Sequence, residues 1–222
     1  EGCEEGMRRM QQALEPGMTE NKLWSILHAA NIELGGEWIE TRLLSSGPRT
    51  FPWFRECAHR VIEAGDMVSF DTDLIGPGGY CSDLSRSWLA GDGKPTEQQK
   101  RIYGIARAQI EHNIGIVRPG LKFSEFVAQS YRLPEEAIPY RYSVLAHGVG
   151  LCDEYPAIRY KEDMARTGYD GTMQPGMTLC VESLVGTPEA GESVKLEEQV
   201  LVTETGCRRL STYPYEDARF GI

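Results

Sequence analysis

Three aspartates lie in the stretch MVSFDTDLIGPGGYCSDLSRSW, residues 67–88, which is otherwise rich in apolar and turn-forming residues. The Gly-Pro-Gly-Gly run at 76–79 predicts a tight turn that joins two antiparallel strands. Side chains two residues apart on a strand share a face, so Asp71 and Asp73 should project together, with Asp83 nearly opposite them. Because an unpaired charge is costly to bury, these carboxylates need a partner of opposite charge.

The composition limits what that partner is. The chain has 222 residues, of which 41% are hydrophobic and 25% charged, which is typical of a globular α/β or α+β domain with one sizeable core. Its formal net charge of −10 argues against nucleic acid or an anionic membrane as the main partner. A cation, or a substrate with a cationic part, fits this charge better.

The cysteines and the start of the chain lead to two further expectations. The six cysteines are scattered and have no Cys-x-x-Cys spacing, a pattern typical of buried thiols in a reducing cytoplasm. We therefore expect a cytoplasmic protein, and the lack of a long apolar run argues against a membrane span. The chain starts at Glu1 without a methionine. We expect residues 1–222 to be a single domain, the C-terminal part of a longer chain.

The predicted elements place helices early and strands late in the sequence. Helical spacing of apolar residues, with Thr19 and Thr96 as N-caps, predicts helices over 5–17, 18–36, 96–117 and about 124–132. The first two should form an antiparallel pair. Extended or alternating segments predict strands within 38–47, 61–75, 80–91, 177–186 and 193–206.

Two glutamates and a histidine lie in surroundings similar to those of the aspartates. Glu182 follows the apolar run Thr-Leu-Cys-Val, Glu197 lies in another strand-like run, and the glycines beside His147 allow close backbone approach. Acidic residues in strands most often face solvent, and a lone histidine is more often a core residue than a ligand. Together with the aspartates, the set also suits a site where cations bind oxygen ligands and one imidazole. The pattern alone leaves both interpretations open.

The motifs FDTD, GYCSDLSRSW, AHGVG, QPGMTLCVES and VKLEEQVLVTETG occur in an order that resembles the creatinase, aminopeptidase P and prolidase family. The resemblance implies the α+β pita-bread fold, in which helices cover a curved antiparallel sheet, and a centre of two divalent metal ions. It also implies a homodimer. The ligand positions carry over to Asp71, Asp83, His147, Glu182 and Glu197, of which Asp83 and Glu197 would bridge the two ions.

Two departures from the family pattern bear on the reaction. Asp73 replaces the glycine that usually follows the first ligand, and it is expected to be a sixth ligand. Asp153 stands where the peptidases place a second histidine, which supports the tetrahedral intermediate. A carboxylate cannot donate to an oxyanion in that position. None of the other histidines, His28, His59 and His112, fits the peptidase roles, so the pattern suggests metals kept for a different reaction.

Within the family, the sequence most resembles the dimethylsulfoniopropionate lyases of marine bacteria, which release dimethyl sulfide and acrylate from this small zwitterion. The resemblance implies that Asp153 is the base that removes the α-proton, and a solvent-exposed loop residue is the alternative. Aromatic faces suit a sulfonium cation, and Tyr142 and Trp53 are the candidates for that contact. Iron is the first choice of metal, with manganese, zinc or cobalt as alternatives.

Three other functions stay open. A prolidase-like or aminopeptidase-P-like metallopeptidase is favoured by family frequency but opposed by Asp73 and Asp153. Creatinase-type hydrolysis meets the same objection, since it too is expected to use histidine. A non-catalytic binding domain would be expected to lose metal ligands, whereas all five ligand positions are filled here.

Overall fold

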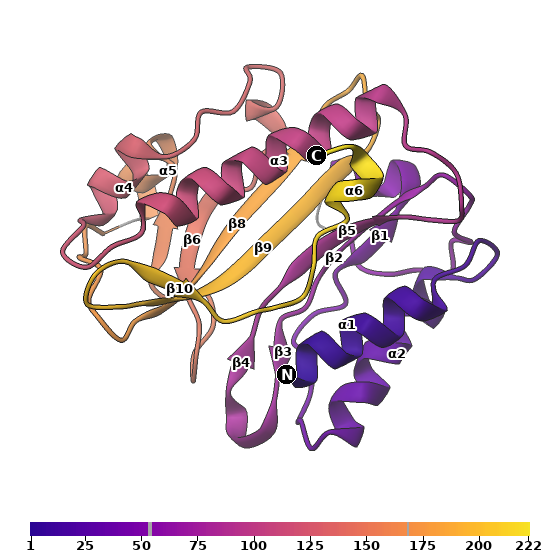
Figure 1. The fold of residues 1–222 in the computed structure, drawn as a ribbon, viewed down its shortest axis with the longest axis horizontal. Helices are drawn as coiled ribbons and strands as arrows, with labels where there is room; N and C mark the ends of the chain where they lie inside the picture. Colours follow the sequence, from indigo (N-terminus) through magenta and orange to yellow (C-terminus); the bar gives the residue numbers. More distant parts are fainter. Residues whose placement is uncertain (53–54, 168) are drawn as a thin grey trace.

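The computed structural model describes residues 1–52, 55–167 and 169–222. A five-stranded sheet of order β10-β9-β8-β6-β7 forms the larger layer, and a three-stranded sheet of order β1-β2-β5 adjoins it along β9 (Figure 1). Every strand pairing among the described residues is antiparallel, which confirms the predicted α+β class. The strands are β1 Leu44–Ser46, β2 Met67–Asp71, β3 Leu74–Ile75, β4 Cys81–Ser82, β5 Ser85–Leu89, β6 Val144–Gly148, β7 Ala157–Arg159, β8 Thr178–Gly186, β9 Ser193–Val202 and β10 Cys207–Arg209.

The helices cover the outer faces of these sheets, and the long helix α3 crosses the five-stranded sheet (Figure 1). Short 3-10 turns lie at Gly47–Thr50, Pro77–Gly79 and Ile138–Tyr140. The α-helices are α1 Gly2–Ala13, α2 Glu20–Glu33, α3 Glu97–Ile116, α4 Phe123–Gln129, α5 Lys161–Thr167 and α6 Asp217–Phe220. No helix in the described ranges is long and apolar enough to cross a bilayer.

The predicted helix caps are confirmed. The Thr96 hydroxyl accepts from the Gln99 amide at 3.1 Å, and the Gln99 side chain accepts from the Thr96 amide, which makes a capping box at the start of α3. At the start of α2, the Thr19 hydroxyl accepts from the Lys22 amide at 3.2 Å. Helix α4 ends at Gln129 rather than near Arg132. The backbone amide of Tyr131 donates to the Asn113 side chain of α3, so it does not continue the helix.

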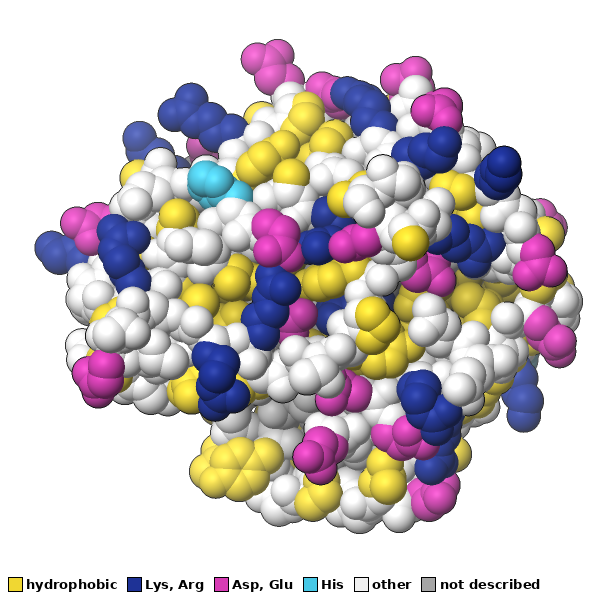
Figure 2. Space-filling view, in the orientation of Figure 1, with side chains coloured by type: hydrophobic (Ala, Val, Ile, Leu, Met, Phe, Trp, Pro, Cys, Tyr) yellow, Lys and Arg dark blue, Asp and Glu magenta, His cyan; other side chains and the backbone are white. Residues whose placement is uncertain are grey.

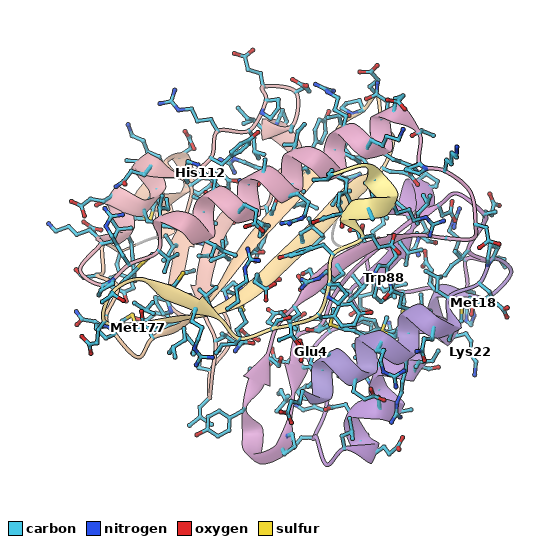
Figure 3. All side chains as sticks on the ribbon, viewed as in Figure 1. Glu4, Met18, Lys22, Trp88, His112 and Met177 are labelled. Atoms are coloured by element: carbon cyan, nitrogen blue, oxygen red, sulfur yellow. The ribbon has the colours of Figure 1, made fainter. Side chains whose placement is uncertain are left out.

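Strand alternation gives the five-stranded sheet two different faces. Leu179, Val181 and Val185 on β8 pack with Leu196 on β9 and Ile110 on α3, so one face of the sheet forms a core under α3. A second core lies between the three-stranded sheet and the helices α1 and α2. Trp88 of β5, labelled in Figure 3, belongs to this second core. The other face of β8 and β9 carries the intervening, mostly polar residues.

The hairpin that carries the aspartates forms as predicted, and its register is now defined. Asp71 pairs with Ser85, and Leu74 pairs with Ser82 across the same antiparallel register, so Asp73 lies opposite Asp83. Asp73 has a positive φ of 36° and separates β2 from β3. The hairpin is therefore kinked where its carboxylates lie.

The turn after β6 is packed against Gly148. A Cβ atom at this residue would lie 2.1 Å from the Tyr155 carbonyl oxygen and 2.6 Å from Pro156 Cδ. At Gly150, in the same turn, a Cβ would find its nearest neighbour, Thr178 Oγ1, at 3.8 Å. The return of the chain from residue 149 to residue 156 thus requires glycine at 148 but not at 150.

We expect Gly148→Ala to lower the free energy of unfolding by about 1–3 kcal/mol, the usual cost of overpacking a site whose neighbours are backbone atoms. Gly150→Ala, the matched control, should stay within about 0.5 kcal/mol of the parent. Urea unfolding followed by circular dichroism measures both. Equal free energies of unfolding for the two variants would show that the turn accommodates a Cβ atom at residue 148 without loss of stability.

Candidate metal centre

The polar face of the two sheets brings the sequence-predicted ligands together. On β6, His147 pairs with Cys180 of β8, and Glu182 of β8 pairs with Glu197 of β9, so these side chains share one face. Asp71 ends β2 and Asp83 precedes β5. All of these ligand candidates are buried.

Hydrogen bonds from β5 to β9 fix the two sheets to one another. The Lys195 amide donates to Ser87 Oγ at 3.0 Å, and Arg86 Nη1 donates to the Glu197 carbonyl at 2.6 Å. Arg86 is itself buried and paired with Glu198 at 3.1 Å. Because these bonds run between backbone and buried side chains, the spacing between the aspartate hairpin and the glutamate strands is set by the fold.

His147 lies at the centre of the acidic residues. Its Nε2 is 3.1 Å from Glu197 Oε1, 3.6 Å from Asp83 Oδ2 and 3.7 Å from Glu182 Oε1. Its Nδ1 lies 3.1 Å from the Gly148 carbonyl oxygen and 3.5 Å from Asp153 Oδ1. One ring nitrogen thus faces the three carboxylates while the other is oriented by acceptors behind it.

Asp153 reaches the site from the turn after β6. One carboxylate oxygen each from Asp73, Asp83 and Asp153 lies within 4.8 Å of the others. The side chain of Asp153 is only 5% exposed. The Cys81 amide donates to the Gly150 carbonyl at 2.6 Å, which ties the turn to the hairpin. The structure therefore places the residue that departs from the peptidase pattern among the candidate ligands.

A buried lysine that the sequence analysis did not identify contacts the same carboxylates. Lys195 Nζ lies 2.9 Å from Asp71 Oδ2, 2.9 Å from Glu182 Oε2 and 2.8 Å from Glu197 Oε2. Its only sequence signal is the Lys-Leu-Glu spacing, which puts it two residues before Glu197 on one face of β9. Lysine is almost never fully buried unless paired, and here its partners come from three strands.

The electrostatics show how strongly these groups interact. Burial, followed by repulsion from neighbouring carboxylates, raises the pKa of Asp73 to about 8 and that of Asp83 well above its usual value. Burial raises the pKa of Glu182 to about 8 even though Lys195 opposes the shift. Glu197 is the exception: despite burial, Lys195 and His147 hold its pKa well below the usual range. Protein cations therefore stabilise one carboxylate fully and leave the others in need of more positive charge.

The donor set fits divalent metal ions. Glu182 Oε1 is buried and has no hydrogen-bond partner among the described residues, although its other oxygen accepts from Lys195. A buried acceptor of this kind costs free energy unless something binds it. Carboxylate oxygens with one imidazole match the preferences of divalent first-row metals.

Of the two aromatic residues predicted to bind substrate, one is described by the structure and lies beside the site. The Tyr142 ring is half-buried beside the site, with its centroid 5.9 Å from Lys195 Nζ and its hydroxyl 3.4 Å from Glu154 Oε1. Trp53 lies outside the described residues. His112, one of the histidines that fit no peptidase role, is exposed on α3, where its Nε2 lies 2.8 Å from the Gln129 carbonyl oxygen of α4 (Figure 3).

Comparisons with known proteins show the family to which this chain belongs. Residues 1–204 match the model of metallopeptidase family M24. The chain is 45% identical to the dimethylsulfoniopropionate lyase DddP of Roseovarius nubinhibens over 99% of its own length and 50% of the relative's. It is 30% identical to the Xaa-Pro dipeptidase of Pyrococcus furiosus over 76% of the chain and 46% of that relative. The chain thus spans about half the length of the curated relatives it matches.

Solved structures show the same fold. The Xaa-Pro dipeptidase from Bacillus anthracis superimposes with a TM-score of 0.85 at 24% identity, covering 97% of this chain and 59% of the other. Prolidase from Pyrococcus furiosus gives a TM-score of 0.81 at 24% identity, over 97% of this chain and 61% of the other. The pita-bread fold and the resemblance drawn from the motifs are therefore confirmed, and the chain belongs to metallopeptidase family M24.

Proposed function

We propose that this chain is the catalytic domain of a metal-dependent lyase that cleaves dimethylsulfoniopropionate to dimethyl sulfide and acrylate. The observation that carries the proposal is the position of Asp153, a nearly buried carboxylate within 4.8 Å of candidate ligand oxygens on Asp73 and Asp83. The 45% identity to a lyase of this name supports the substrate. The share of the relatives' length that is covered supports a longer parent protein.

Asp153 has the properties of a general base. Burial, opposed by the nearby His147, raises the pKa of Asp153 to about 6, close to the range in which a base accepts and releases protons near neutral pH. In the proposed reaction its carboxylate takes the proton from the carbon next to the substrate carboxylate. The electron pair forms the double bond of acrylate, the carbon–sulfur bond breaks, and the sulfonium leaves as neutral dimethyl sulfide. The proton then passes from Asp153 to solvent.

The proposed ligands divide into two sets that share Asp83 and Glu197. Asp71 and Asp73 would hold one ion, and His147 and Glu182 would hold the other. Each set is compatible with the contacts above, because each carboxylate keeps at least one lone pair beyond its hydrogen bonds; on Glu197, whose Oε2 accepts from both Ser85 and Lys195, it is Oε1 that remains. When bound, divalent ions would supply Lewis acidity for the charge that develops on the substrate carboxylate. Iron remains our first choice of metal.

Tyr142 is proposed to bind the substrate. Its ring lies beside the site and offers an apolar, electron-rich face to a sulfonium group. Trp53 stays a sequence-based prediction for the same role. The homodimer and the cytoplasmic location are likewise proposals that rest on the resemblance and on the cysteine pattern.

A metallopeptidase is the second candidate, because the family match and the 30% identity to an Xaa-Pro dipeptidase favour it. The position of Asp153 opposes it, since a carboxylate there cannot donate a hydrogen bond to a tetrahedral oxyanion. Parallel assays with dimethylsulfoniopropionate and a proline dipeptide separate the two activities.

Asp153→Asn should reduce lyase turnover by about 10²–10⁴-fold, because an amide of the same size cannot accept the proton. Headspace dimethyl sulfide from the metal-loaded full-length protein is the measurement, with metal content determined on the same sample. Asp92→Asn, which removes an exposed carboxylate outside the site, is the matched control and should retain parental turnover. Unchanged sulfide release from Asp153→Asn would remove this residue from the mechanism.

Chelation should lower the melting temperature of the parent protein, because the buried carboxylates would then repel one another without their cations. Asp83→Ala removes a proposed shared ligand, so its melting temperature should respond little to chelator or added metal. Differential scanning calorimetry with and without chelator measures both responses. The proposed centre would be contradicted if the parent protein is fully active without bound metal and its melting temperature is unchanged by the chelator.

Lys195→Met should destabilise the chelated protein by about 3–5 kcal/mol, since it leaves three buried carboxylates without their cation. Added metal should recover more stability in this variant than in the parent. Lys94→Met, an exposed lysine, serves as the control and should behave like the parent. Chemical unfolding at fixed metal concentrations gives the comparison, and a metal response equal to the parent's would argue against Lys195 as a counter-ion of the site.

A further inference from the structure

Cys180 is a buried thiol at the candidate metal centre that has no place in the ligand set above. It lies on β8 directly opposite His147 of β6, and it precedes Glu182 by two residues, so it shares their face of the sheet. Its side chain is fully buried. Its thiol donates weakly to the Asp83 carbonyl oxygen, with Sγ and oxygen 3.4 Å apart.

The thiol is part of a compact group of possible ligand atoms. One atom each from Asp83, His147, Cys180 and Glu197 lies within 4.8 Å of the other three, and all four residues are buried. Around a single ion with ligands at roughly 2.0–2.3 Å, tetrahedrally placed donor atoms would lie roughly 3.3–3.8 Å apart. The four atoms are thus near enough to one another for side-chain rotation to bring them to one ion. The group combines sulfur, nitrogen and oxygen donors, a mixture that suits zinc and other borderline or soft metals.

We propose that Cys180 supplies a sulfur ligand to the ion that His147 and Glu182 would hold together with Asp83 and Glu197. This inference rests on the metal centre proposed above. Formation of the sulfur–metal bond replaces the sulfur–hydrogen bond, and the proton leaves to solvent. Asp83 and Glu197 still serve both positions, while the sulfur belongs to one of them.

The consequence is a centre with two chemically different positions. The position near Asp71 and Asp73 offers only oxygen donors, which suit harder ions such as manganese. The position near His147 offers sulfur and nitrogen as well, which favours zinc or iron(II) over manganese. Cys180 would therefore determine which metal occupies the second position.

The test is X-ray absorption at the zinc edge of the full-length protein, stripped by chelation and reloaded with zinc. We expect a sulfur neighbour at about 2.3 Å in addition to nitrogen and oxygen neighbours at about 2.0–2.2 Å. Cys180→Ser should lose the sulfur neighbour while keeping bound zinc. Cys207→Ser is the matched control, because the Cys207 thiol also donates to a carbonyl at 3.4 Å but lies outside the described groups of possible ligands.

A competition measurement supplies a second readout. Cys180→Ser should lower the ratio of zinc affinity to manganese affinity by about tenfold or more. Losing a hydrogen-bond partner of a metal ligand lowers metal affinity by a comparable factor. If Cys180→Ser fails to fold, Cys180→Ala is measured in its place. The zinc-edge spectrum of the parent protein shows by itself whether zinc has a sulfur neighbour. Zinc bound with nitrogen and oxygen neighbours alone, or a sulfur neighbour that persists in the Cys180 variants, would overturn the role of Cys180 and leave the metal centre standing. A parent protein that binds no zinc, manganese or iron would overturn both.

Discussion

The packing of carboxylates against one another in a buried sheet face is the constraint on which the rest of this structure depends. Asp71, Asp83, Glu182 and Glu197 are all nearly inaccessible to solvent, and the protein groups that oppose their charge are Lys195 and His147. An unpaired buried charge is too costly to persist, and burial accordingly raises the pKa of several of these acids. The fold holds them there nevertheless, which is the arrangement expected where bound cations complete the charge balance.

Strand alternation separates this charged face from the core. On β8 and β9 the residues facing α3 are almost all apolar and close a core with it, while the residues between them face the site. Burial of the apolar core on the opposite side of the same strands thus offsets the unfavourable free energy of holding the acids in place. Both faces of this sheet are covered, so the charged groups cannot relax into solvent by a small movement. The solvent-exposed side of the molecule that carries α3 differs from this buried face, because acidic and basic side chains are interspersed on it (Figure 2).

Local patterns predicted much of this, and the limits of the prediction have physical causes. The hairpin, the capped helices and the alternating strands depend on residues close in sequence, and they were found where the sequence placed them. The sequence does not predict strand β6, which carries His147, because its five residues show no alternation and one of its two partners, β8, lies far along the chain. Lys195 was overlooked because burial of a lysine depends on partners from β2 and β8. Only the fold shows that these strands meet.

The approach of Asp153 shows most directly how tertiary structure changes the meaning of a residue. From the sequence alone, a solvent-exposed loop residue is the alternative to a role as base. In the structure, the close passage of the chain at Gly148 folds this turn back toward the hairpin, and Asp153 comes within reach of His147 and of the aspartates. A carboxylate in that position adds negative charge to a site already rich in it, so it disfavours a developing oxyanion. In the proposed reaction it would instead accept a proton, and burial, opposed by His147, raises the pKa of Asp153 to about 6. Under the proposed lyase function, the replacement that opposes peptide hydrolysis would therefore supply the base for the elimination.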